Sequence, residues 1–342
     1  MNHLAPLLLP WFAGNKRDLP WRRDREPYHV WLSEIMLQQT RVEAVRGYYS
    51  RFLQALPDIA SLAEAPEDLL LKLWEGLGYY SRARNLQKAA RIIRELHGGS
   101  FPRDYAAIRA LPGIGDYTAG AISSICFDAP RAAVDGNVLR VLSRYRADHG
   151  DISLPQTKKA AARALEAVYP PEQCGDFTQA LMELGATVCL PNGAPLCESC
   201  PLKARCRAKA LGCQRELPVK APKKPRKSRA RTVLILLLGE KIALCRRPET
   251  GLLAGLWQLP DTEGSLSARE ALELAERWGL HPTQLLQMQE KRHVFTHVTW
   301  EMRGYYIRCS AEGELSWFDR SLLQTQIGLP TAYRQFLDTF IV

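Results

Sequence analysis

The sequence contains no apolar segment long enough to cross a membrane. The longest apolar run beyond the first residues, Val233–Leu238, has the length of a strand, whereas a transmembrane helix needs about 20 apolar residues. The start of the chain is apolar but short, lacks a basic region and is interrupted by Pro6 and Pro10, so it is not typical of a signal peptide. We therefore expect a cytoplasmic protein without a membrane partner.

The sequence also lacks an excess of acidic residues, and it contains no internal repeat. Its 46 Lys and Arg residues outnumber 36 Asp and Glu residues, which gives a net charge of +10. This balance suits a polyanionic partner, most often nucleic acid, although a soluble basic enzyme without such a partner has the same balance. A length of 342 residues and a hydrophobic content of 46% predict about two ordinary globular domains.

Four of the nine cysteines lie in one short loop that also contains proline. Cys189, Cys197, Cys200 and Cys206 follow the spacing C-x7-C-x2-C-x5-C, which is typical of a metal centre. Zinc sites usually use two separated C-x2-C pairs, and only one such pair is present, so the spacing favours a cubane iron–sulfur cluster over zinc. A disulfide-bonded loop would need an oxidising compartment, for which nothing in the sequence argues.

The pattern of apolar residues divides the chain into a helical and a mixed part. Residues 1–213 predict one helix after another, for example over 58–73, where apolar residues recur at three- and four-residue spacing. Residues 214–230 are basic, rich in proline and without periodicity, so they predict a linker. Residues 231–342 predict strands around a single helix at 268–278. The expected fold is a mainly α region followed by a smaller α+β domain.

A helical hairpin is predicted between residues 104 and 127. One helix should end at Leu111, and a second should start near Asp116 after a Pro-Gly-Ile-Gly turn. Gly113 and Gly115 allow backbone N–H groups to converge beside a helix N-terminus, where they can bind a DNA phosphate. The alternative is a plain helix–turn–helix corner. Because its charge would lie near that phosphate, we expect Asp116 to serve as the N-cap of the second helix.

Two carboxylates are predicted to lie in different surroundings. Glu34 has the apolar neighbours Val30, Trp31 and Leu37 on its helix face, so we expect a desolvated carboxyl with a raised pKa. The alternative is a surface glutamate at a helix edge. Asp135 precedes a helix and should stay ionised near its N-terminus, although a plain N-cap would use the same position. One protonated acid and one carboxylate are the pair that cleaves glycosidic bonds.

Five segments of the chain form one set: SEIMLQQTRV, GLGYYSRARNLQKAA, LPGIGDYTAGAI, VDGNVLRVL and the four-cysteine loop. Together they resemble a known family, the MutY-type adenine DNA glycosylases. This family belongs to the helix-hairpin-helix base-excision glycosylases that carry a [4Fe–4S] cluster, and the match covers most of residues 8–213. It implies a six-helix module at about 20–130 and an iron–sulfur module formed by the N-terminal helix and residues 131–213. The family also has a Nudix-like C-terminal domain.

The resemblance implies a monofunctional DNA N-glycosylase that excises adenine mispaired with 8-oxoguanine, or less readily with guanine, in base-excision repair. The implied partner is double-stranded DNA with such a mispair, bound by a monomer in the bacterial nucleoid. Glu34 would protonate the flipped adenine at N7, and Asp135 would stabilise the oxocarbenium-like sugar. Asn137 would hold Asp135 or the sugar–phosphate. Tyr117 stands where bifunctional relatives carry a Schiff-base lysine, which predicts base removal without strand cleavage.

The resemblance also implies residues that hold the two bases. Arg22 and Gln179 would line the adenine pocket. Gln38 or Gln39, together with Tyr79, would enter the base stack around 8-oxoguanine; for Tyr79 the alternative is an aromatic core residue. Arg22 stands in LPWRRDR and Gln179 in FTQALMELGA, and the other three stand in segments quoted above.

In the predicted second domain, the loop Phe295-Thr296-His297 would read the lesion, with Thr in place of the family's usual Ser. The alternative is that Phe295 belongs to the core and His297 is a surface donor. The Glu-rich metal helix of Nudix hydrolases is missing from AREALELAERWGL, residues 268–280, so triphosphate hydrolysis is not expected.

Two departures and two rivals accompany the resemblance. Seven residues separate Cys189 and Cys197 where the family usually has six, and Asp116 replaces a neutral or basic residue. An endonuclease III-like lyase would need lysine at position 117 and no second domain. A lesion-binding module without enzymatic activity would not need both carboxylates.

The basic side chains beside the four-cysteine loop are expected to bind phosphate: Lys203, Arg205 and Arg207.

Overall fold

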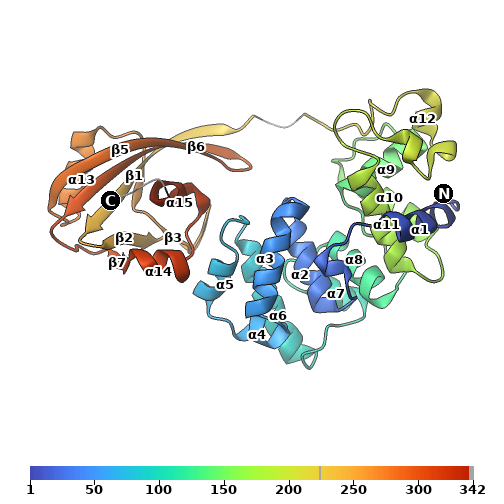
Figure 1. Ribbon diagram of the computed structural model, residues 1–342, viewed down its shortest axis with the longest axis horizontal. Coiled ribbons are helices and arrows are strands. Elements are labelled where there is room, and N and C mark those ends of the chain that lie inside the picture. The colour runs from blue at the N-terminus through green and yellow to red at the C-terminus, as the bar shows by residue number, and fades with distance from the viewer. Residues whose placement is uncertain (223–224, 339–342) are drawn as a thin grey trace. The chain divides into compact units, whose positions relative to one another are not determined.

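A computed structural model describes residues 1–222 and 225–338 of the chain (Figure 1). Lys223 and Lys224 of the predicted linker, and the last four residues of the predicted second domain, lie outside the described residues. The chain forms two compact units. The first unit joins residues 1–64 to 85–222, and the second joins residues 65–84 to the C-terminal part from residue 223 onward.

The first unit is helical, as predicted, and α11 is its central helix, packed against α1, α8 and α9. Among the described residues, no helix is long and apolar enough to cross a membrane. The helix that begins at Ser81 passes from the second unit into the first. The elements are α1 (Leu4–Asn15), η1 (Pro20–Arg22), α2 (Pro27–Leu37), α3 (Val42–Ala55), α4 (Ile59–Glu64), α6 (Ser81–Leu96), α7 (Tyr105–Ala110), α8 (Asp116–Phe127), α9 (Gly136–Arg146), α10 (Pro155–Glu166), α11 (Cys174–Thr187), η2 (Cys197–Ser199), η3 (Lys203–Arg205) and α12 (Arg207–Leu211).

Two glycines allow the first turn of α9 and the segment before it to lie close to their neighbours. A Cβ atom on Gly120 of α8 would stand 2.2 Å from the carbonyl oxygen of Ala132, and one on Gly185 of α11 would stand 2.5 Å from Cβ of Asn137. Side chains at either glycine would displace backbone, since such distances are far below van der Waals contact. The segment that carries Asp135 is therefore fixed between α8 and α11.

The single helix predicted over residues 58–73 is wrong. The chain forms α4, which ends at Glu64, and α5 (Glu67–Leu73), which belongs to the second unit. Pro66 separates them with an extended backbone at φ −58° and ψ 140°. Proline has no N–H group and disfavours helical geometry at the residue before it, so the apolar periodicity continues across a break in the helix.

The second unit contains a mixed sheet with the strand order β3-β2-β1-β6-β5, in which β1 and β6 are parallel. Strand β4 also pairs with β1, and β7 pairs with β2. Alternate residues of β1 enter two apolar cores on opposite faces, one covered by α15 (Thr331–Leu337) and the other by α13 (Ala268–Arg277) (Figure 1). The strands are β1 (Lys227–Leu238), β2 (Lys241–Arg246), β3 (Trp257–Gln258), β4 (Asp261–Glu263), β5 (Pro282–Val294), β6 (Val298–Cys309) and β7 (Ser316–Asp319).

The α+β expectation for this part is confirmed, but the expectation of a single helix is wrong. Besides α13 (Ala268–Arg277), it contains α14 (Arg320–Thr325) and α15 (Thr331–Leu337). Both are too short for a 3.6-residue periodicity to stand out in the sequence.

Much of the basic segment between the predicted domains has a defined place. Leu217 is buried, and its carbonyl accepts a hydrogen bond of 2.9 Å from Arg144 Nε. The carbonyl of Val219 accepts from the Ile152 N–H at 3.1 Å. Strand β1 starts at Lys227, before the predicted end of the linker. Several residues of the predicted linker are thus held by contacts or belong to a strand, while the predicted domain boundaries themselves stay predictions.

Candidate active site and four-cysteine loop

A cavity of about 350 Å³ lies in the first unit, with walls from α2, α8, α9 and α11. It brings together side chains that are far apart in the sequence. Among the residues that line it are eight of the predicted site residues, namely Arg22, Glu34, Gln38, Gln39, Tyr117, Asp135, Asn137 and Gln179.

Glu34 is 6% exposed as a residue and lines the cavity from α2. Burial raises its pKa to about 7, the nearby charge of Asp135 acts in the same direction, and a hydrogen bond from Tyr117 and the charge of Arg22 act against it. Tyr117 Oη donates to Glu34 Oε2 at 2.5 Å. The predicted rise in pKa is confirmed, and the surface alternative for Glu34 is wrong. A carboxyl with a pKa near 7 is available as a proton donor at neutral pH.

Asp135 faces the same cavity from the N-terminus of α9. Its Oδ1 accepts from the Val138 N–H at 2.7 Å, and its Oδ2 accepts from Asn137 Nδ2 at 2.8 Å. Asp135 is thus the N-cap of α9, as the alternative proposed, and it also lines the cavity. We expected the helix N-terminus to keep Asp135 ionised, but burial outweighs the hydrogen bonds and raises its pKa. The ionised form of Asp135 is therefore stabilised by three neighbours, Val138, Asn137 and Arg140, which all act to lower that pKa.

Arg140, which sequence reasoning missed, holds Asn137 in place. Its Nη2 donates to Asn137 Oδ1 at 2.8 Å and to the carbonyl of Gly185 at 2.7 Å, while its Nε donates to the carbonyl of Cys189 at 2.7 Å. The side chain is buried, and burial lowers its pKa. A lone arginine inside the apolar run VLRVL was the available signal, since buried arginines are rare unless they are paired.

Glu183 was also missed, and it fixes Arg22 at the cavity wall. Arg22 Nη2 donates to Glu183 Oε2 at 2.8 Å, and Arg17 Nε donates to Oε1 at 2.7 Å. Burial alone would raise the pKa of Glu183, but the hydrogen bonds from both arginines outweigh it and lower the pKa. A fully ionised glutamate with two guanidinium partners gives Arg22 one defined orientation.

The four predicted metal ligands line one small cavity of about 30 Å³, together with Arg144, Lys203 and Lys209. All nine cysteines are free thiols, so the disulfide alternative for this loop is wrong. Arg144 Nη1 donates to Cys189 Sγ at 3.3 Å. Burial raises the pKa of Cys200 to about 11. Three cations around four thiols suit a group that binds them as thiolates, because each thiolate adds a negative charge.

A site for one metal ion requires closely spaced ligand atoms. A single zinc ion holds sulfur atoms at about 2.3 Å, which places the sulfurs within roughly 4 Å of one another. Throughout residues 1–222 and 225–338, no three Cys, His or acidic side chains are grouped closely enough to hold one ion.

The predicted hairpin is present as α7, a tight turn and α8. Gly113 has a φ of +78°, and a Cβ atom there would stand 2.8 Å from Cβ of Asn85. Gly115, with its extended backbone, is the N-cap of α8, so the prediction that Asp116 serves as the cap is wrong. Asp116 is the first helical residue, and its carboxylate pairs with Arg109 Nε at 2.5 Å. Its charge near the turn is therefore neutralised.

The remaining predicted site residues meet in the second unit, where they line a cavity of about 440 Å³. Tyr79 is 43% exposed, so the core alternative for it is wrong, and its hydroxyl is hydrogen-bonded to Thr296 Oγ1. Phe295 is half-buried and packs edge-on against Trp300, with 4.8 Å between ring centroids. The core alternative thus holds in part for Phe295. His297 is exposed.

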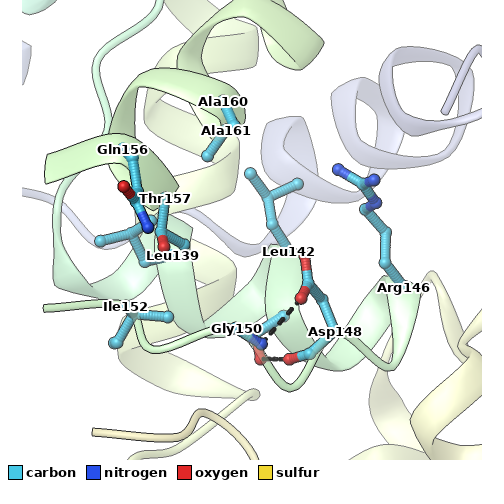
Figure 2. Close-up of a pocket in the computed structure, with 11 residues that line it drawn as sticks. Leu139, Leu142, Arg146, Asp148, Gly150, Ile152, Gln156, Thr157, Ala160 and Ala161 are labelled. Atoms are coloured by element: carbon cyan, nitrogen blue, oxygen red, sulfur yellow. Dashed lines mark hydrogen bonds between the residues drawn. The ribbon is translucent and has the colours of Figure 1, made fainter. Parts of the chain in front are cut away.

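A further cavity of about 360 Å³ lies beside α9 and α10 in the first unit (Figure 2). Leu139, Leu142 and Ile152 form its apolar part. The carboxylate of Asp148 at its rim accepts a hydrogen bond from the Gly150 N–H at 2.9 Å. None of the predicted site residues lines this cavity.

Each of the two units matches a known protein family. Residues 32–171 match the HhH-GPD superfamily base excision DNA repair protein family, and residues 232–339 match the NUDIX domain family. A solved structure of a thermostable thymine-DNA glycosylase is 31% identical, with a TM-score of 0.55, over 60% of this chain and 95% of that one. A non-covalent endonuclease III–DNA complex, 24% identical with a TM-score of 0.51, shows the same fold over 62% of this chain and 98% of that one.

Curated relatives extend over both units. The human adenine DNA glycosylase is 38% identical over 87% of this chain, which spans 66% of the human protein's length. The adenine DNA glycosylase of Buchnera aphidicola subsp. Baizongia pistaciae is 34% identical over 95% of this chain and 93% of its own length. The HhH-GPD match, the NUDIX match and the curated relatives all indicate the same family. The chain belongs to the adenine DNA glycosylase family of base-excision repair proteins.

Proposed function

We propose that the protein is a monofunctional N-glycosylase that removes adenine paired with 8-oxoguanine or guanine in double-stranded DNA. The observation that carries this proposal is that Glu34, with a pKa near 7, and Asp135 face one cavity of about 350 Å³. An acid that keeps part of its protons at neutral pH and a carboxylate held by hydrogen bonds are what the cleavage of an N-glycosidic bond requires. The family relationship supports adenine as the base.

In the proposed reaction, Glu34 gives its proton to N7 of adenine while the bond between the sugar C1′ and N9 breaks. Adenine then leaves as a neutral base, and the bonding electron pair goes with it. General acid catalysis of this kind contributes roughly 10²–10⁴-fold in rate. Asp135 faces the cation that develops on the sugar and stabilises it. A water molecule adds at C1′, and the proton that it releases restores Glu34.

Tyr117 supports base removal without strand cleavage. Its phenol donates to Glu34, and burial together with that carboxyl raises the tyrosine pKa well above its ordinary value. The side chain therefore stays a neutral phenol and offers no amine for a Schiff base with the sugar. A lyase of the endonuclease III type would need such an amine at this position.

The adenine has to leave the duplex to reach the cavity, because its target atoms are inaccessible inside the base stack. Arg22, oriented by Glu183, and Gln179 offer hydrogen bonds to the flipped base. Gln38 Nε2 donates to Thr118 Oγ1 at 3.4 Å, whereas Gln39 has a φ of +61° at the corner after α2. Backbone strain of this kind is common where a side chain is displayed for function, so we assign the stacking role to Gln39.

The base opposite the adenine, 8-oxoguanine or guanine, is assigned to the cavity of about 440 Å³ in the second unit. Tyr79 offers an exposed ring, while Thr296 and His297 offer a hydroxyl and an imidazole to the N7–H and the extra oxygen of 8-oxoguanine. Each glutamate of α13 is already engaged: Glu270 caps the helix at Ser267, Glu273 pairs with Arg269, and Glu276 bonds His281. This unit is therefore assigned to recognition and not to hydrolysis of triphosphates.

The four thiols are assigned to a [4Fe–4S] cluster with a structural role. The exposed side chains of Arg205 and Arg207, and the backbone of the turn at Gly113 and Gly115, would bind phosphates of the duplex. The protein would act as a monomer on DNA in the cytoplasm, at the nucleoid. Purified protein should contain about four irons per chain, and colourless protein with stoichiometric zinc would contradict the cluster.

One assay tests the proposed activity. A duplex with a single adenine opposite 8-oxoguanine is incubated with the protein and analysed with and without later alkali. Breaks that are seen only after alkali show base removal without strand cleavage, and breaks without alkali show a lyase. A duplex with adenine opposite guanine measures the second substrate, and one with adenine opposite thymine is the control. No break after alkali in either mispair would refute the proposal.

A further inference from the structure

Three charged side chains join residues 65–84 to the C-terminal part of the second unit. Glu75 Oε1 accepts from Arg334 Nη2 at 2.7 Å, from Arg334 Nε at 3.0 Å and from the Leu329 N–H at 3.0 Å. Glu75 Oε2 accepts from Lys72 Nζ at 2.7 Å. The side chains of Lys72, Glu75 and Arg334 are only 15–19% exposed. They are mostly removed from water, where a charge needs several partners to be stable.

The two cations of this cluster have such additional partners. Lys72 Nζ also donates to the carbonyls of Leu323 at 3.1 Å and Ile327 at 3.2 Å, and Arg334 Nη2 donates to the carbonyl of Leu323 at 2.9 Å. Next to them, a Cβ atom on Gly328 would stand 3.0 Å from the Leu71 carbonyl oxygen, so the two backbones approach closely. These contacts fix α5 against the loop between α14 and α15.

A second anchor lies at the other end of the same segment. Arg84 Nη1 donates to the carbonyl of Ala254 at 2.7 Å, and its Nε donates to Glu67 Oε1 at 2.6 Å. A Cβ atom on Gly255 would stand 2.9 Å from Arg84 Nη2, so the loop that follows Gly251 lies directly against this guanidinium. Residues 65–84 are thus attached to the Nudix-like domain at both ends.

Tyr79 lies between the two anchors, in a stretch that no helix holds. Gly76 and Gly78 have φ values of +96° and +70°, and Tyr79 itself has a φ of +48°. A residue other than glycine in the left-handed region is strained, so contacts around it must maintain the conformation. The hydroxyl of Tyr79 bonds to Thr296, across the cavity of about 440 Å³.

We propose that Glu75, together with Lys72 and Arg334, is a positioning residue for recognition of the base opposite adenine. The cluster holds Tyr79 at a set position relative to Thr296 before DNA binds, and this position determines which partner base fits the cavity. This inference rests on the proposed function of that cavity. It assigns Glu75 no contact with DNA, because its carboxylate is fully used by Arg334, Lys72 and Leu329.

The test replaces Glu75 by Gln, which keeps the shape of the side chain and removes its charge. Single-turnover excision rates are measured for adenine opposite 8-oxoguanine and for adenine opposite guanine. The ratio of the two rates should fall about tenfold, the effect of losing one charge-assisted hydrogen bond. The rate opposite guanine should stay within about twofold of wild type, because the catalytic cavity lies in the first unit.

Matched variants separate positioning from a general loss of stability. Arg269→Gln removes an exposed ion pair with Glu273 on α13 of the same unit, and it should leave the ratio unchanged. Arg84→Gln weakens the second anchor and should lower the ratio in the same direction as Glu75→Gln. If Glu75→Gln does not fold, Arg84→Gln still decides the matter. An unchanged ratio in folded Glu75→Gln, or an equal loss on both mispairs, would overturn the inference.

A second readout needs no activity. Hydrogen exchange of the backbone amides of residues 76–84 is measured in the DNA-free protein, and exchange should be faster in Glu75→Gln than in wild type and in Arg269→Gln. Unchanged protection of these amides would show that the cluster does not hold the segment. If wild type removes no adenine at all, the proposed function fails, while the exchange measurement still decides whether Tyr79 is held in place.

Discussion

Tyr117 donates a 2.5 Å hydrogen bond to Glu34, and this bond partly offsets the effect of burial on the carboxyl. Burial raises the pKa of Glu34 and the phenol lowers it, with a result of about 7. Without the phenol the proton would be held more tightly than an acid catalyst needs. The pair therefore sets both the availability of the proton and the ease with which it is transferred.

Replacing Glu34 by Gln should reduce excision of adenine by roughly 10²–10⁴-fold, because the proton donor is lost while the shape of the side chain is kept. Affinity for a duplex with adenine opposite 8-oxoguanine should remain near that of wild type. Single-turnover kinetics and a binding titration measure the two effects. A near-normal rate in this variant would show that another group protonates the base.

The same substitution should stabilise the protein, and the effect should depend on pH. Below about pH 4.5 the carboxyl is protonated in both the folded and the unfolded state, so it has no effect. Between pH 4.5 and 7 the unfolded state loses its proton first, so the stability of wild type falls as the pH rises. Above pH 7 the cost to wild type reaches at most about 3 kcal/mol.

Thermal melting at a series of pH values checks this prediction. The difference in Tm between Glu34→Gln and wild type should grow from pH 4.5 to 7 and then stay constant. Gln38→Ala, at the same cavity but without a titrating group, is the control and should show no such growth. A difference that shrinks as the pH rises would mean that the carboxyl is not buried in the way the structure shows.

A feature of this site could be predicted when it depends on residues that are near one another in the sequence. Glu34 was predicted because its apolar neighbours stand at i−4, i−3 and i+3 on one helix, a pattern that a sequence shows directly. Its partner Tyr117 is 83 residues away. Arg140 and Glu183 were missed because their roles depend on backbone carbonyls and arginines that only the folded chain brings near.

The fold shows the same division. Helical and mixed regions were predicted from periodicity, and the hairpin from its glycines. The break at Pro66 could have been foreseen from the chemistry of proline. The attachment of residues 65–84 to the C-terminal part could not, because it depends on contacts such as Glu75 with Arg334, which are 259 residues apart.

Replacing Asp135 by Asn separates the two roles of this residue. Asparagine is as good an N-cap as aspartate, so the stability of the protein should change little. A neutral amide cannot stabilise a sugar cation to the same degree, so excision should fall by at least about 10²-fold. Tm and single-turnover rates are measured together, and full activity in this variant would leave Asp135 with the capping role alone.

Replacing Tyr117 by Lys should introduce strand cleavage. The new amine would lie beside the sugar in the same cavity, where it can form a Schiff base that borohydride traps. Base removal itself should slow, because an ammonium next to Glu34 lowers the pKa of that carboxyl and leaves less of it protonated. Tyr117→Phe is the control, which should trap no adduct. The absence of a trapped species in the lysine variant would place residue 117 away from the sugar.

Replacing both Phe295 and His297 by Ala tests whether the second unit reads the lesion. Deletion of residues 214–342 is a weaker test, because it would also uncover the buried side of residues 65–84 and remove the partners of Lys72 and Glu75 in the C-terminal part. The double substitution leaves that cluster intact. His297 is exposed, so its replacement should weaken recognition of the lesion. Phe295 is half-buried against Trp300, so its replacement should also lower the stability of the second unit.

The two effects separate when His297→Ala is made alone. We expect it to lower affinity for adenine opposite 8-oxoguanine by about five- to tenfold, the value of one or two hydrogen bonds, and to leave affinity for adenine opposite guanine within about twofold. His281→Ala, at the exposed end of α13, is the matched control. An equal loss on both mispairs would mean that the loop only supports the fold. A loss confined to 8-oxoguanine would mean that the imidazole contacts a feature that guanine lacks, which is what the position of His297 in the cavity with Tyr79 and Thr296 leads us to expect.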